Sequence, residues 1–153
     1  MVLGRGGAGK STFALALGAQ TGLPVYELDS YFWQSGLRPL SPADWRRTQM
    51  LLVSEPGWVL DGDLGPYDVL DARLPVADTV ILLDYAFLIC AWRALRRSRE
   101  GKEFWVWVWQ YRRRHLGPLL RAVREHAPFA ELHHLRSPRE ARRFLHALAT
   151  SAG

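Results

Sequence analysis

The sequence predicts an α/β fold in which short parallel strands alternate with helices. Short apolar runs alternate with longer amphipathic segments along the 153 residues. A glycine-rich loop, GRGGAGKST at residues 4–12, lies between the first apolar run and a helical pattern. Asp29, Asp61 and Asp84 each follow or end an apolar run. The carboxyl ends of parallel strands are where α/β proteins bind their ligands, so these acids are candidate site residues.

The first strand is expected at residues 1–3. This strand is short for the centre of a sheet, since strands usually have about five residues, and we hypothesise that the natural reading frame begins further upstream. After the loop, the run STFALALGAQTG has Phe13 and Leu17 at helical spacing and Gly22 where a helix would end. These features predict a helix directly after the loop.

Four further strands and two further helices follow from the pattern of apolar residues. The strands are expected at residues 25–28, 58–61, 79–84 and 131–135. A helix is predicted from Ser41 as N-cap, with Pro42 at its first position and Asp44 at the capping-box position. The last helix is expected to begin near Pro138 and to run through Leu148.

The segment from Trp92 to Lys102 is rich in arginine. Arg93, Arg96 and Arg97 fall on adjacent helical turns, and a loop carrying Arg99, Gly101 and Lys102 is expected to follow. Arginines in a closing lid neutralise a phosphoryl group during transfer and exclude water, so we predict a short lid near residues 93–104. The alternative is a solvated basic helix face.

The run FWVWVWQYRRRH at residues 104–115 is ambiguous between two structures. Its strict alternation suits a strand, whereas Trp105, Trp109 and Arg112 also fall on one helical face. We predict a helix. Aromatic rings followed by arginines can also contact a nucleic acid, but tryptophan at these spacings is more often part of a core, and nucleic acid is not the favoured partner.

The loop at residues 4–12 satisfies the pattern G-x-x-x-x-G-K-[ST], whose backbone amides hold phosphate groups. Its lysine reaches the β- and γ-phosphates and its serine hydroxyl binds the Mg²⁺ that bridges them. The alternative is a glycine-rich turn that matches the pattern by chance. We expect ATP and Mg²⁺ here, held by Gly4, Gly6, Gly7, Ala8, Gly9, Lys10, Ser11 and Thr12.

The strand-end acids have different expected roles. Asp29 is followed by three aromatic residues, and an acid at this place can orient a phosphoryl acceptor or take its proton; the alternative is a cap beside packed rings. Asp61 is the preferred acidic residue for holding Mg²⁺ together with Ser11. Asp84 is the other candidate for the acidic residue.

Composition limits the classes of protein that fit. The net charge is +5, with 6 basic and 8 acidic residues in 1–76 against 14 basic and 7 acidic residues in 77–153. This asymmetry suits either a nucleic-acid surface or arginines around a transferred phosphate.

Cys90 is the single cysteine, which excludes an internal disulfide. We expect a cytoplasmic protein without a membrane span, because Arg93 interrupts the longest apolar run. The five histidines lack zinc-ligand spacing.

Nearly the whole chain resembles the adenylate-kinase-like P-loop proteins, including the "DNA topology modulation" proteins. The motifs that carry this resemblance are GRGGAGKSTFA at 4–14, PVYELDSYFW at 24–33, WVLDGD at 58–63, ADTVILLD at 77–84, the WR and RR of 92–97, and LRSPREARRFL at 135–145. The first motif is shared by many P-loop proteins, and the ordered combination is much more specific.

The resemblance implies a three-layer, doubly wound P-loop nucleoside triphosphate hydrolase fold of the nucleotide-kinase type, with strand order 2-3-1-4-5. It also implies that Asp29 faces the acceptor and that Asp61 supports the metal. Members of the family commonly read D-G-N-Y where this chain has residues 61–64 as DGDL. This departure affects the acceptor side, because an ionised aspartate at position 63 accepts hydrogen bonds but cannot donate them.

Taken together, these features predict a single-domain ATP-Mg²⁺-dependent phosphotransferase acting on a nucleotide, nucleoside or similar small molecule. The expected catalytic residues are Lys10, Asp29, Arg93, Arg96 and Arg97. Two alternatives remain open, namely a nucleic-acid-associated P-loop ATPase or topology-modulation regulator, and a nucleotide-binding switch without turnover.

Overall fold

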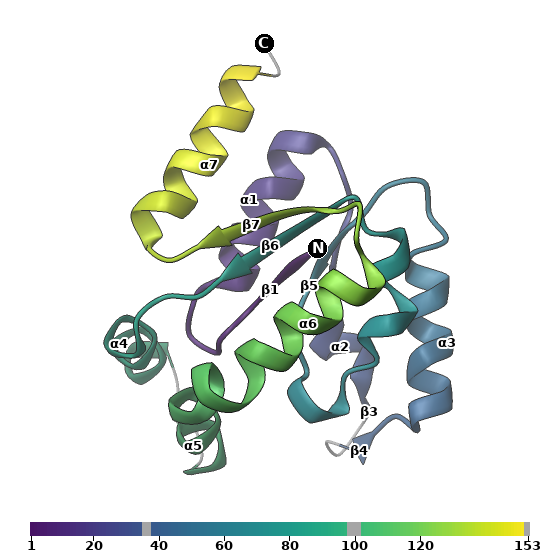
Figure 1. Ribbon diagram of the computed structural model, residues 1–153, viewed down its shortest axis with the longest axis horizontal. Coiled ribbons are helices and arrows are strands. Elements are labelled where there is room, and N and C mark those ends of the chain that lie inside the picture. Colours follow the sequence, from purple (N-terminus) through teal and green to yellow (C-terminus); the bar gives the residue numbers. More distant parts are fainter. Residues whose placement is uncertain (35–37, 98–101, 152–153) are drawn as a thin grey trace.

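A five-stranded parallel sheet forms the centre of the protein in the computed structural model, which describes residues 1–34, 38–97 and 102–151 (Figure 1). Its strands are β1 (Val2–Gly4), β2 (Val25–Glu27), β5 (Val59–Asp61), β6 (Thr79–Leu83) and β7 (Glu131–Leu135). They are hydrogen-bonded in the order β2-β5-β1-β6-β7, and every neighbouring pair is parallel. The strand that leads into the glycine-rich loop is therefore central.

The labelled strand order differs from the predicted 2-3-1-4-5 because of two strands that no sequence pattern predicts. These are β3 (Trp33–Gln34) and β4 (Arg38–Pro39), which pair antiparallel with each other as a separate ribbon. If only the five strands of the central sheet are numbered in chain order, their order across the sheet is 2-3-1-4-5. The difference therefore lies in the additional ribbon.

Helices cover both faces of the sheet, which gives the three layers expected. Helices α1 (Lys10–Thr21) and α7 (Pro138–Ser151) pack on one face, where Val2 and Ile81 are buried with Phe13. Helices α3 (Pro42–Leu52) and α6 (Leu116–His126) cover the other face, where Leu3 and Leu82 are buried. In Figure 1, α6 crosses in front of the sheet and α1 lies behind it. Successive residues of each strand thus serve opposite cores.

The predicted helix ends at α1 and α3 are confirmed by their hydrogen bonds. Gly22 adopts φ 72° after α1, and its N–H donates to the Gly18 carbonyl oxygen at 2.9 Å. Ser41 caps α3, where its Oγ accepts from the Asp44 N–H at 3.2 Å and its hydroxyl donates to Asp44 Oδ2 at 2.6 Å. Local sequence therefore determines where these helices begin or end.

The connection from β5 to β6 has no α-helix. Three short 3₁₀ turns fill it, η1 (Gly65–Tyr67), η2 (Leu70–Ala72) and η3 (Leu74–Val76). Arg73 crosses this segment with its side chain fully buried and donates from Nη1 and Nη2 to the two oxygens of Asp68, at 2.6 and 2.7 Å. Nη2 also donates to the Gly62 carbonyl oxygen at 3.2 Å, and Nη1 donates to Gln49. This network fixes the loop that follows β5.

A run of helices joins β6 to β7. It consists of α4 (Phe87–Arg97), α5 (Lys102–Gln110), a π-helical turn η4 (Tyr111–His115) and α6. The helix predicted at 104–115 is confirmed, but the loop expected at Lys102 is wrong because α5 begins there. Arg99 and Gly101, the other residues of that expected loop, lie outside the described residues. Within the part that is described, no helix is both long and apolar enough to cross a membrane.

Candidate functional site

The glycine-rich loop connects β1 to α1 with a backbone that requires glycine. Gly9 is the N-cap of α1 at φ 91°, and no side chain caps this helix end, so its first N–H groups are available to an anion. Gly4 and Gly7 also have positive φ, at 140° and 77°, whereas Gly6 does not. A Cβ on Gly7 would lie 2.4 Å from the Cys90 carbonyl oxygen. The loop is thus held closely against the start of α4.

We expect Gly7→Ala to lower the free energy of unfolding by about 3 kcal/mol, since strain at positive φ adds to a backbone clash. Gly22→Ala is the matched control, because Gly22 has a similar φ of 72° but nothing lies within 4 Å of its added Cβ. The control should lose only about 1 kcal/mol. Urea unfolding of both variants measures the difference, and equal losses would contradict the close approach.

Lys10 lies across the mouth of the loop. Its Nζ donates to the carbonyl oxygens of Gly4 at 2.9 Å and Arg5 at 3.4 Å, and the side chain is partly buried. A phosphate held by the loop amides would sit close to this ammonium. Lys10 also acts electrostatically on both Asp61 and Asp63. The cation therefore connects the loop to the carboxyl end of β5.

Asp61 ends β5 beside the loop and is only 3% exposed. Its Oδ1 has no hydrogen-bond partner within the described part of the chain. Burial raises the pKa of this carboxyl, while hydrogen bonding from Ser11 and the charge of Lys10 act in the opposite direction. A buried carboxylate oxygen beside a serine hydroxyl fits Mg²⁺, which prefers oxygen ligands and takes several of them from phosphate and water.

Asp84 does not fit the metal role that Asp61 fits. Its Oδ1 accepts from Arg112 Nε at 2.9 Å and its Oδ2 lies 3.1 Å from His134 Nε2. Its carbonyl oxygen also accepts from Arg112 Nη2 at 3.2 Å. Asp84 therefore connects the end of β6 to the π-helical turn and to β7. Among the described residues, no group of three or more His, Cys, Asp or Glu side chains is arranged to hold a metal.

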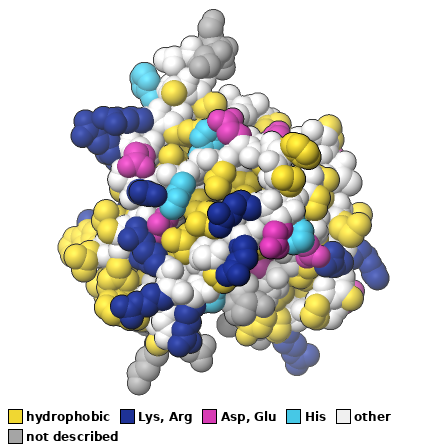
Figure 2. All heavy atoms as spheres, viewed as in Figure 1, with side chains coloured by type: hydrophobic (Ala, Val, Ile, Leu, Met, Phe, Trp, Pro, Cys, Tyr) yellow, Lys and Arg dark blue, Asp and Glu magenta, His cyan; other side chains and the backbone are white. Residues whose placement is uncertain are grey.

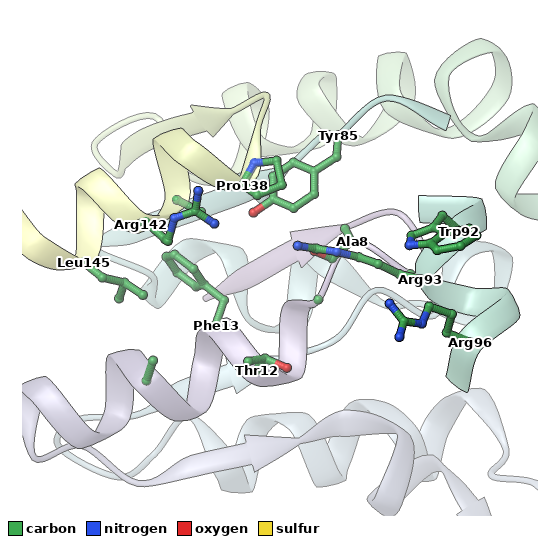
Figure 3. A pocket seen from close by; sticks show the side chains of 14 residues that line it. Ala8, Thr12, Phe13, Tyr85, Trp92, Arg93, Arg96, Pro138, Arg142 and Leu145 are labelled. Atoms are coloured by element: carbon green, nitrogen blue, oxygen red, sulfur yellow. The ribbon is translucent and has the colours of Figure 1, made fainter. Parts of the chain in front are cut away.

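A cavity of about 490 Å³ opens beside the loop, between α1, α4 and α7. Figure 3 shows Arg93 and Arg96 reaching into it from α4, while Tyr85 and Arg142 lie on the other side. Arg93 Nη1 donates to the Ala8 carbonyl oxygen at 2.9 Å, and its guanidinium lies 5.5 Å from the centre of the Tyr85 ring. Two of the predicted lid arginines are therefore placed next to the loop.

The other predicted site residues are Thr12, Asp29 and Arg97. Thr12 lines the cavity, and its side chain is exposed. Asp29 is exposed in the first turn of α2 (Leu28–Phe32), since β2 ends at Glu27 and not at Leu28 as predicted. The charge of Asp29 nevertheless acts on Asp61. Arg97 is the last residue of α4, and its side chain lies outside what the structure describes.

Comparison with known proteins identifies the fold. No protein-family profile matches the chain, and no curated protein matches its sequence. Among solved structures, a sugar kinase from Janibacter sp. HTCC2649 is 20% identical with a TM-score of 0.57, over 99% of this chain and 89% of that one. A gluconokinase from Sinorhizobium meliloti 1021 is 19% identical with a TM-score of 0.57, covering 99% and 93%. A shikimate kinase from Bacteroides thetaiotaomicron is 14% identical with a TM-score of 0.56, covering 99% and 95%.

This chain has the fold of these small-molecule kinases. Each match extends over nearly the whole length of both compared chains, so the shared fold includes the central sheet and its helices. At these identities the comparison concerns the fold and not the substrate.

Several residues of the site were not predicted from the sequence. Tyr85 and Arg142 line the cavity from positions remote from the loop. Arg5 is buried, with its guanidinium 5.6 Å from the Tyr111 ring centre and its Nη1 3.4 Å from the Tyr85 carbonyl oxygen. The Tyr111 hydroxyl donates to Asp63 Oδ2 at 3.1 Å. Of these residues, only Arg142 could have been noticed in the sequence, because it lies in the motif LRSPREARRFL at 135–145.

Proposed function

We propose that the protein is an ATP-Mg²⁺-dependent phosphotransferase that acts on a small molecule. The observation that carries the proposal is that Ser11 and Lys10 of the loop interact with the buried Asp61, while other residues of the same loop, among them Gly7, Gly9 and Thr12, line a cavity of about 490 Å³. The kinase fold supports it, because that fold is shared over nearly the whole chain. We further propose that residues 1–153 form one domain with a short arginine-rich lid near 93–104.

Each proposed role follows from the chemistry of the side chain. The loop amides at residues 4–12 and Lys10 would bind the β- and γ-phosphates. Ser11 and Asp61 would hold Mg²⁺, which supplies charge neutralisation between those phosphates when bound. Arg93 and Arg96 would stabilise charge on the transferring phosphoryl group, together with Arg97.

The cavity suits the nucleoside part of ATP. Phe13 and Leu145 give it apolar surface, while Tyr85 gives it an aromatic ring and Arg142 a cation. Pockets for small ligands combine such apolar walls with a few placed polar groups. With ATP on this side of the loop, Asp29 would position the acceptor on the side of β2.

The test is phosphorus NMR of ATP and Mg²⁺ with the protein and a panel of nucleosides, nucleoside monophosphates and sugars. A new phosphorylated species that is absent with the Lys10→Ala variant would establish a kinase and name its acceptor class. Slow release of free phosphate alone would favour an ATPase. No reaction, together with a rise in melting temperature on adding ATP, would favour a nucleotide-binding switch.

We expect Asp61→Asn to reduce transfer by about 100-fold because a metal ligand loses its charge. The same variant should gain about 1 kcal/mol in free energy of unfolding, since burial disfavours the charged form of this carboxyl. Asp84→Asn is the matched control, as it also follows a central strand but pairs with Arg112 and His134. The Asp84→Asn variant should have a lower free energy of unfolding than the unchanged protein. Urea unfolding and transfer assays on both variants check this, and a destabilised Asp61→Asn protein would contradict it.

A nucleic-acid-associated ATPase, including the topology-modulation type, is the second candidate. The observation in its favour is the excess of 14 basic over 7 acidic residues in 77–153. On the face drawn in Figure 2, basic side chains are dispersed among acidic and hydrophobic ones and form no continuous stripe. Gel shifts with duplex DNA at two salt concentrations separate the candidates, because phosphate-driven binding falls steeply with salt.

A further inference from the structure

Helix α4 has an exposed apolar side. Leu88, Trp92 and Leu95 are spaced four and three residues apart, which places them on one side of the helix. Their exposed fractions are 77%, 62% and 67%. Cys90 and Ala94, on another side of the helix, are buried. Helix α4 therefore contributes to the core with one side and presents large apolar side chains at the surface with another.

Helix α5 adds to this exposed apolar area. Val106 and Trp109 are 53% and 59% exposed. The Trp109 ring contacts the Phe87 ring of α4 edge-to-face, with the ring centres 5.1 Å apart, so the two helices meet next to Leu88. Figure 2 shows hydrophobic side chains gathered over α4 at the left of the view. We use the term apolar surface for five exposed side chains of α4 and α5, namely Leu88, Trp92, Leu95, Val106 and Trp109.

Exposed arginines border the apolar surface. Arg96 follows Leu95, and its guanidinium lies 5.5 Å from the centre of the Trp92 ring. Arg113 and Arg114 are exposed in the π-helical turn η4. Arg113 follows Trp109 by four positions, which is close to one full turn of an α-helix or a π-helix. Residues 87–115 carry 8 lysine and arginine side chains against 2 acidic ones. The apolar surface thus lies within a strongly basic part of the chain.

This combination of apolar and basic side chains favours a lipid surface over two other occupants. A second copy of the chain in a two-fold dimer would bring the same basic excess against itself. Single-stranded nucleic acid stacks its bases on aromatic rings, whereas Leu88, Leu95 and Val106 are aliphatic. At a membrane, leucine and tryptophan enter the boundary between headgroups and acyl chains, while arginine binds anionic headgroups.

We propose that α4 and α5 bind the surface of a membrane that contains anionic lipid. The leucines and the valine of the apolar surface would enter the acyl boundary, and its two tryptophans would lie at the level of the headgroups. Arg113 and Arg114 would bind lipid phosphate. This attachment is peripheral and requires no helix that crosses the membrane. It does not rest on the proposed kinase function, since vesicle binding needs neither ATP nor an acceptor.

The apolar surface adjoins the cavity beside the glycine-rich loop. Trp92 belongs to both, because it also lines the cavity together with Arg96. Among the described residues that line the cavity, none is Leu88, Leu95 or Val106. Substitutions at these three positions therefore change the apolar surface without changing the cavity wall.

The test is sedimentation of the full chain with two kinds of vesicle, one of phosphatidylcholine alone and one of an equal mixture of phosphatidylcholine and phosphatidylglycerol. We expect binding to the mixed vesicles to be at least about tenfold tighter. This binding should weaken as salt is added, because salt screens the attraction between arginine and headgroup. Equal binding to both kinds of vesicle, or no binding to the mixed vesicles, would overturn the proposal.

A leucine variant tests the apolar contribution. Leu88→Gln combined with Leu95→Gln should weaken binding to the mixed vesicles by about tenfold or more, because two apolar side chains no longer enter the acyl boundary. Leu15→Gln is the matched control, since Leu15 is 63% exposed on α1. The control should bind as the unchanged protein does. Equal binding by the double variant and the control would contradict the proposal.

An arginine variant tests the contribution of charge. Arg113→Gln combined with Arg114→Gln should weaken binding to the mixed vesicles by about 30-fold, since each arginine near an anionic surface contributes about fivefold. The matched control removes the same charge elsewhere, by Arg47→Gln on α3 combined with Arg139→Gln on α7, both of which are exposed positions. The control should change binding by less than about twofold. Equal losses in the two double variants would mean that only net charge matters, which would overturn the proposed orientation.

Two measurements without vesicles examine the other occupants. Sedimentation velocity should show a monomer, and a dimer that the double leucine variant separates would overturn the proposal in favour of an interface between copies. A single-stranded oligonucleotide should bind the double leucine variant as it binds the unchanged protein. Weaker binding of the oligonucleotide by this variant would overturn the proposal in favour of a nucleic-acid surface.

Discussion

Replacing Lys10 by alanine should reduce phosphoryl transfer by about a thousandfold or more while the protein stays folded. The ammonium donates to the Gly4 and Arg5 carbonyl oxygens of the loop and its charge acts on both Asp61 and Asp63, so its loss removes the cation that connects the loop to these acids. The fold should tolerate the change because alanine is the best helix former and the hydrogen bonds of Lys10 to described residues go to the backbone oxygens of Gly4 and Arg5.

The control for this variant is Arg47→Ala. Arg47 is a positive residue on α3 with 76% of its side chain exposed and only a 3.9 Å pairing with Asp44. Its removal lowers the net charge equally and should leave both transfer and melting temperature unchanged. Phosphorus NMR and thermal unfolding of both variants give the comparison. Full transfer by Lys10→Ala would disprove the role of the loop lysine.

Replacing Arg73 by leucine should lower the free energy of unfolding by about 3–5 kcal/mol, because it leaves the buried Asp68 carboxylate without its cation. The loss should be larger than for most substitutions, since the guanidinium also holds Gln49 and the Gly62 carbonyl oxygen. The loop that carries Asp63 would lose its support as well. Urea unfolding measures the effect.

The matched control is the exposed pair between Arg46 and Asp71, which has a similar distance of 2.5 Å but side chains 45% and 43% exposed. Arg46→Leu should cost no more than about 1 kcal/mol. The double variant Arg73→Leu with Asp68→Leu should recover part of the loss, since two apolar residues bury no unpaired charge. Equal losses for the buried and exposed arginines would show that burial does not determine the energy.

The features that sequence predicted well are those set by residues near one another in the chain. The glycine-rich turn before α1, the N-cap Ser41 and the terminating Gly22 each depend on backbone geometry within a few residues. The strand at 131–135 was also predicted with its observed bounds. Local chemistry alone specifies such elements.

Features that depend on distant partners were not predictable. Asp61 and Asp84 look alike in sequence, and only the approach of Arg112 and His134 shows that Asp84 is already paired. The ribbon of β3 and β4 has two residues in each strand, which is too short for any alternation to be visible. The buried contacts of Arg5 with Tyr85 and Tyr111 likewise join residues far apart in the chain.

The π-helical turn at Tyr111–His115 has a consequence for the length of the chain. Val108 packs with the core under α1 and α7, whereas Leu119 and Val123 pack with the core on the opposite face of the sheet. One extra residue in a helical turn rotates everything after it by about 100° about the helix axis. Related chains can therefore vary the type of residue within this turn more freely than the number of residues, since a deletion would point α6 away from the sheet.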